Sequence, residues 1–175
     1  KFWARVGLGS IVLSGIEAAL LALKGKMLGV PVYELLGGRC HDTLPCYATG
    51  GTSPHDRGEL AGKVEQYLGL GFHAVKLGAG TYRPGHPIVA SRTAQEARDV
   101  EVGKIEFLRE RFGDTFQLNL DAHMDFLGEA DHVWSLPTAQ FVLKALEAYP
   151  IGFFEEALPY TDMRAYSALR ASTTI

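Results

Sequence analysis

Three polar residues alternate along one short segment and could together bind a cation and transfer protons. Asn119, Asp121 and His123 alternate with apolar residues in the segment 116–126. Side chains two positions apart share one face of a strand, so we expect these three to point the same way. A carboxylate and an imidazole at the end of an apolar-backed strand suit a hard metal ion and proton transfer. The alternative is that Asp121 caps the next segment and His123 is an ordinary loop histidine.

The composition is that of one globular domain. The chain has 175 residues, of which 47% are hydrophobic and 21% are charged, so it is long enough to bury a core. A net charge of -3 and the lack of a Lys/Arg run argue against a nucleic-acid partner.

The cysteines and the N-terminal segment bear on where the protein works. Cys40 and Cys46 form no CxxC or zinc-ligand spacing, which predicts buried thiols in a reducing, cytoplasmic setting. No signal peptide is visible at the start of the sequence. The apolar run from Ile16 to Leu23 contains Glu17 and ends at Lys24, so we expect it to be too short and too charged to span a membrane.

Strand and helix patterns alternate through most of the chain. These elements would position Asn119, Asp121 and His123. The N-terminal part predicts helices instead: Ser14 and Glu17 form a capping-box pair at a helix start, and residues 31–36 form a short second helix. From residue 44 onward, four strands are expected, each followed by a helical apolar stripe, at residues 44–49, 72–78, 116–121 and 152–158.

Repeated strand–helix units predict an α/β fold with a parallel sheet, either an open doubly wound sheet or part of a (β/α)8 barrel. In both, function lies at the carboxyl ends of the strands. Lys76, Asp121 and Glu155 fall there on three successive strands, which favours a functional site. Two longer links, 78–94 and 124–138, are either lids over this site or surface insertions.

Several separate motifs, in order, resemble one enzyme family. Residues 14–26 and 28–38, together with 72–76, 118–121 and 153–156, are similar to the mandelate racemase/muconate lactonizing branch of the enolase superfamily. The resemblance covers nearly the whole chain. It implies a magnesium ion held by carboxylates of three successive barrel strands, and a base that removes the proton beside a substrate carboxylate. The cation and nearby lysines would stabilise the resulting enediolate.

The resemblance implies roles for individual residues. Asp121 matches the first metal ligand and Glu155 the second, whereas Glu156 is expected to point to the other face. Lys76 matches the first lysine of a Lys-x-Lys pair near the substrate carboxylate.

Two positions depart from the family pattern. The second lysine, often the base, is replaced by Gly78, which cannot abstract a proton. His123 stands where Asn is common, and an imidazole titrates near neutrality, so His123 could supply the missing acid/base function, as in some acid-sugar dehydratases.

The resemblance implies a partial (β/α)8 barrel of about four βα units: residues 1–43 as linker helices to a capping domain, and 44–175 as the N-terminal half-barrel. The third metal ligand would lie beyond Ile175. Exposed parallel strand edges promote association, so we expect a longer natural protein and a homo-oligomer. The expected function is Mg2+-dependent dehydration of an acid sugar. The alternatives are a racemase, epimerase or cycloisomerase, and a catalytically silent half-barrel scaffold.

Overall fold

A computed structural model describes residues 7–50, 56–79, 81–83, 86–89, 93–124 and 133–175. The chain divides into two compact units, residues 1–45 and 46–175. Each unit is described by itself.

The first unit contains two helices, α1 (Leu8–Leu28) and α2 (Val32–Leu35). The predicted start of the first helix was wrong. Ser14 lies inside α1, where its hydroxyl donates to the Ser10 carbonyl at 3.0 Å instead of capping the helix. Gly29, with φ of 68°, ends α1 in the left-handed region, and the backbone of Val30 donates to the Gly25 carbonyl at 3.0 Å.

Helix α1 is longer and more apolar than expected. It has 21 residues and, among the described residues, is the one helix whose length and composition would allow it to cross a membrane. The expectation that this segment is too short to span a bilayer was therefore wrong on length, since the helix begins six residues before Ser14. Its large apolar side chains are exposed within the unit: Leu8, Ile11, Val12, Leu13, Ile16, Leu20, Leu23, Met27 and Leu28.

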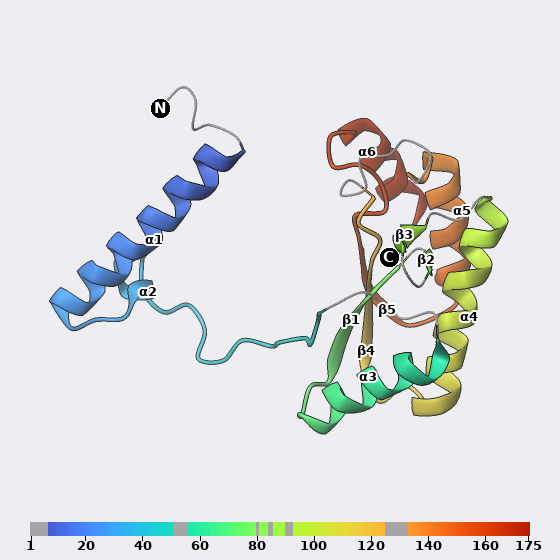
Figure 1. Cartoon of the computed structure of the whole chain (residues 1–175), viewed down its shortest axis with the longest axis horizontal. Coiled ribbons are helices and arrows are strands. Elements are labelled where there is room, and N and C mark those ends of the chain that lie inside the picture. Colours follow the sequence, from blue (N-terminus) through green and yellow to red (C-terminus); the bar gives the residue numbers. More distant parts are fainter. Residues whose placement is uncertain (1–6, 51–55, 80, 84–85, 90–92, 125–132) are drawn as a thin grey trace. The chain divides into compact units, whose positions relative to one another are not determined.

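The second unit is an α/β layer built on a parallel sheet, in which helices cover one face (Figure 1). Strands β1 (Ala74–Gly78), β4 (Gln117–Asp121) and β5 (Ile151–Glu155) pair in the order β1-β4-β5, and both pairings are parallel. Helix α3 (Arg57–Gly69) precedes β1, α4 (Ala94–Phe112) and α5 (Leu136–Leu146) connect the strands, and α6 (Met163–Ser172) follows β5. The prediction of an α/β fold with parallel strands is thus confirmed.

The core lies between the sheet and these helices. Val75, Leu77, Leu118 and Leu120 alternate along β1 and β4 and are at most 1% exposed. They share one core with buried residues of the helices, among them Leu60, Val64, Ile105, Leu108, Val142 and Leu146. The period-2 pattern that predicted the strands therefore reflects a sheet face packed against helices.

Two features of this unit differ from the sequence prediction. The expected strand at 44–49 is reduced to an isolated bridge, in which Ala48 pairs with Val75. A short antiparallel pair, β2 (Thr81–Arg83) and β3 (His86–Val89), occupies the link after β1. The link at 124–138 falls largely outside the described residues.

Both cysteines are exposed, which makes the prediction of buried thiols wrong. Cys40 and Cys46 lie in the irregular segment between α2 and α3, outside the packed elements. Packing therefore does not shield them.

Candidate active site

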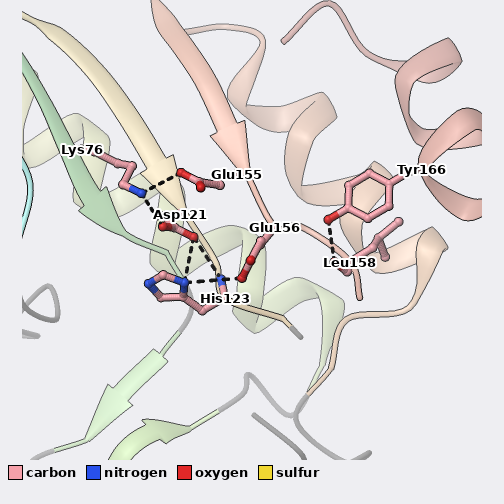
Figure 2. A network of polar contacts seen from close by, with 7 residues as sticks. All are labelled: Lys76, Asp121, His123, Glu155, Glu156, Leu158 and Tyr166. Carbon is pink, nitrogen blue, oxygen red and sulfur yellow. Dashed lines mark hydrogen bonds and ion pairs between the residues drawn. The ribbon is translucent and has the colours of Figure 1, made fainter. Parts of the chain in front are cut away.

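The carboxyl ends of the three parallel strands bring three charged side chains together. The register pairs Gly78 with Asp121 and Asp121 with Glu155, so these strands end at one level. Lys76 Nζ lies 2.7 Å from Asp121 Oδ2 and 2.6 Å from Glu155 Oε2 (Figure 2). Lys76, Asp121 and Glu155 thus converge as the strand topology led us to expect.

Asp121 is the most buried member of this group, at 3% exposure. It ends β4, and the neighbouring Leu118 and Leu120 face the helices. On the polar face, Asn119 accepts a hydrogen bond from Gln117 at 3.0 Å. A buried carboxylate requires a charge partner or hydrogen bonds, and Lys76 supplies the charge.

His123 occupies the turn directly after β4. Its φ of 51° lies in the left-handed region, which turns the backbone back toward Asp121. Its backbone N–H donates to Asp121 Oδ1 at 3.3 Å, and its Nδ1 lies 3.1 Å from the same oxygen. The imidazole is 53% exposed, so it is held at the site yet open to solvent.

Glu156 also joins the site, contrary to the expectation that it points to the other face. Its φ is 47°, so the alternation of side chains along β5 ends at Glu155. Its Oε2 lies 3.5 Å from His123 Nδ1. A strand-period argument cannot detect this, because it assumes an extended backbone.

The backbone beyond the strand ends keeps these residues in register. Ala122 donates to the Glu155 carbonyl at 3.0 Å, and Met124 donates to the Glu156 carbonyl at 3.1 Å. In the segment that follows Glu156, the Leu158 carbonyl accepts a hydrogen bond from the Tyr166 hydroxyl at 2.6 Å (Figure 2). The turn carrying His123 is thus paired with the segment carrying Glu156.

A buried ion pair supports the end of β1, and sequence analysis missed it. Lys104 Nζ donates to the Gly78 carbonyl at 2.7 Å and to Glu101 Oε2 at 2.8 Å. Glu101 is fully buried on α4. The i, i+3 spacing of Glu101 and Lys104 is a helical ion-pair signal, but it did not indicate contact with a strand.

The electrostatics of Lys76 favour its charged form. Burial alone would lower its pKa, but hydrogen bonds to Asp121 and Glu155, and the charges of these carboxylates, raise the pKa above its ordinary value. Lys76 is therefore an ammonium group at neutral pH.

Within the part of the chain that the structure describes, two groupings of side chains fit a metal ion, and both include Asp121. The first is Asp121 with Glu155, whose oxygens already surround one positive atom, Lys76 Nζ. The second is Asp121, His123 and Glu156, whose ligand atoms lie within 4.8 Å of one another. Carboxylate oxygens suit Mg2+, which binds through one or two carboxylates and shares its remaining positions with water or substrate. The residues present therefore fit a divalent cation.

The fold and the site define an α/β protein with charged groups gathered at the ends of parallel strands. Residues 59–175 match the enolase C-terminal domain-like family. The chain belongs to this family, within the mandelate racemase/muconate lactonizing branch of the enolase superfamily. The resemblance seen in the sequence is thus confirmed.

Curated relatives and solved structures share this assignment. The chain is 36% identical over 171 residues to D-galactonate dehydratase of Xanthomonas oryzae pv. oryzae, an alignment that covers 95% of this chain and 40% of the relative. It superposes on 3,6-anhydro-D-galactonate cycloisomerase from Zobellia galactanivorans with a TM-score of 0.78 at 26% identity, covering 99% of this chain and 42% of that one. Because this match covers 99% of the chain, it includes helix α1.

A third comparison concerns the fold alone. An enolase from Pantoea ananatis, solved with bound D-gluconate and Mg, matches at 24% identity with a TM-score of 0.66, covering 89% of this chain and 41% of that one. The chain therefore spans about 40% of the length of the relatives it matches.

Proposed function

We propose that this chain is part of a divalent-metal-dependent acid-sugar dehydratase. The observation that carries the proposal is the convergence of Lys76, Asp121 and Glu155 at one point, with the His123 imidazole held against Asp121. The likeness to a D-galactonate dehydratase supports the same reaction class.

Asp121 and Glu155 would hold the cation, with Mg2+ as the expected ion, and further ligands would come from outside these 175 residues. When bound, the cation would stabilise negative charge on the substrate carboxylate. Lys76 would bind the same carboxylate through its ammonium group. The partial (β/α)8 barrel, with residues 1–43 as linker helices and 44–175 as its first half, remains part of this proposal, as do a cytoplasmic location and homo-oligomer formation.

His123 would act as the acid/base group. Dehydration removes a proton from the carbon beside the carboxylate and breaks the bond to the hydroxyl group on the next carbon, which leaves as water after it gains a proton. Because Nδ1 faces Asp121 Oδ1, Nε2 lies on the opposite side of the ring and would exchange the proton. Gly78 has no side chain and takes no part.

The second candidate reaction is cycloisomerisation, or a related racemisation or epimerisation. The match to a 3,6-anhydro-D-galactonate cycloisomerase favours it. The glycine at position 78 weighs against it, since these reactions often use a pair of lysines. The two reactions differ in their products, because only dehydration releases water.

The third candidate is that the 175 residues alone are catalytically silent and serve as an associating scaffold. Asp121 and Glu155 are two of the three carboxylate ligands that the family resemblance implies, so we expect them to bind Mg2+ weakly by themselves. We therefore propose that activity belongs to a protein longer than these 175 residues, as the relatives are.

The test is a divalent-metal titration followed by assay against a panel of acid sugars, including D-galactonate and D-gluconate. It uses the polypeptide as the organism makes it. A 2-oxo acid product lighter than its substrate by one water supports dehydration, and a product of unchanged mass supports isomerisation. If the natural polypeptide shows neither metal affinity nor turnover, the proposed dehydratase function is wrong.

A further inference from the structure

The Lys76 ammonium group contacts one oxygen of each carboxylate that a cation shared by Asp121 and Glu155 would bind. Its single Nζ atom lies within 2.7 Å of one oxygen from each carboxylate. Mg2+ binds carboxylate oxygens at about 2.0–2.1 Å. An ion bound to both oxygens would therefore compete with Nζ for the same two acceptor atoms.

The two cations exclude one another for reasons of space and charge. An ammonium group a few ångströms from a divalent ion is strongly repelled, because the local environment screens charge less well than water does. The Asp121 and Lys76 side chains are only 3% and 14% exposed, whereas that of Glu155 is 43% exposed, so screening by water is reduced chiefly at Asp121 and Lys76.

The burial of Asp121 explains why a positive charge lies beside it. Two carboxylates that share one site repel each other, and a buried carboxylate without a partner is costly. Asp121 directs Oδ1 toward His123 and Oδ2 toward Lys76. Without a positive charge at Nζ, the second oxygen and Glu155 Oε2 would face each other uncompensated.

We propose that Lys76 is a stand-in cation, which neutralises Asp121 and Glu155 in the metal-free protein and leaves them when a divalent ion binds. This inference rests on the proposed function, since it assumes that these carboxylates bind a metal. It adds a coupling: Lys76 becomes available to an anionic substrate only after the ion has taken its place.

The first test compares the Mg2+ affinity of the natural polypeptide with that of Lys76→Met by calorimetry. The variant has no ammonium group to displace, so its dissociation constant is expected to fall about tenfold or more, the equivalent of one charge-assisted hydrogen bond. Lys144→Met is the matched control, because it also removes one positive charge, from an exposed ion pair with Glu147 on α5. Its affinity for Mg2+ should not change.

The second measurement does not depend on how well the variant folds. A crystal structure of the unmodified protein with Mg2+ should show Lys76 Nζ beyond 4 Å from both Asp121 Oδ2 and Glu155 Oε2, the limit used for an ion pair. Retention of both contacts beside the bound ion would overturn the inference.

The outcomes separate the inference from the proposed function. If the natural polypeptide binds no Mg2+, the proposed function fails, and this inference fails with it. If the natural polypeptide binds Mg2+ but Lys76→Met binds it equally or more weakly, the stand-in role is wrong while the proposed function stands.

Discussion

Asp121 Oδ1 accepts the backbone N–H of His123 at 3.3 Å and lies 3.1 Å from Nδ1 of the same residue. One carboxylate oxygen thereby fixes both the turn after β4 and the orientation of the imidazole. The other oxygen, Oδ2, contacts Lys76 at 2.7 Å. Asp121 is thus shared between the cation position and the acid/base group, so mutations at Glu155 and at His123, not at Asp121, separate the two roles.

Replacement of His123 by Asn should remove acid/base catalysis while retaining the fold. Turnover of the acid sugar is expected to fall about 10²- to 10⁴-fold, the usual contribution of a general acid or base. Steady-state kinetics on the natural polypeptide provide the measurement. His73→Asn is the control, since His73 is exposed at the opposite end of β1. Unchanged turnover in His123→Asn would remove this residue from the mechanism.

Neutral substitutions at the three carboxylates distinguish the two metal groupings. Asp121→Asn and Glu155→Gln should each weaken Mg2+ binding by at least about tenfold, because each removes a charged ligand. Glu156→Gln should change it much less. Calorimetry on all three variants is the measurement. The opposite order, with Glu156 essential and Glu155 dispensable, would assign the ion to Asp121, His123 and Glu156.

Two glycines of α1 should respond oppositely to alanine. A Cβ at Gly25 would lie 2.8 Å from the Val30 carbonyl oxygen, so Gly25→Ala should cost about 1–3 kcal/mol by forcing the backbone apart. Gly15 has nothing within 4 Å of such a Cβ, so Gly15→Ala should add about 0.5–1 kcal/mol through helix propensity. Urea unfolding followed by circular dichroism measures both. Equal effects would contradict the close approach at the end of α1.

Glu147 should make stability depend on acid pH. A hydrogen bond from Lys144, followed by one from the Thr174 backbone, lowers its pKa from 4.5 to about 2. A carboxyl group whose folded pKa is depressed stabilises the fold above its unfolded pKa, and that stability is lost as the pH falls toward the folded pKa. The difference in Tm between the natural protein and Glu147→Gln should therefore be present at pH 6 and shrink as the pH falls from about 4.5 to about 2.

Thermal unfolding across this pH range is the measurement for Glu147. Glu110→Gln, at an exposed position on α4, serves as the control and should show no such difference. A gap between Glu147→Gln and the natural protein that widens as the pH falls would contradict the assignment.

Period-2 alternation in the sequence predicted much of the candidate site. The strand expected at 116–121 appears as Gln117–Asp121, and the one at 152–158 as Ile151–Glu155. Alternation works here because helices pack on one face of the sheet, which forces apolar and polar side chains to opposite sides. Asp121 and Glu155 therefore fell at the strand ends as the pattern predicted.

The features that sequence analysis missed arise where local patterns do not determine the backbone. Glu156 was assigned to the wrong face, because its left-handed φ cannot be inferred from the residue type. Ser14 resembled a helix cap, yet its hydroxyl bonds to the carbonyl of Ser10 within the helix. The contact of Lys104 with the Gly78 carbonyl joins a helix to a strand 26 residues away, a relationship that only the folded chain reveals.

The left-handed backbone at Glu156 has a consequence for attempts to engineer this protein. Such a conformation costs a residue with a Cβ about 1–2 kcal/mol, whereas glycine adopts it freely. A directed-evolution screen for heat resistance alone should therefore enrich Gly at position 156. Each variant selected in this way would resist heat better but would lack the carboxylate beside His123.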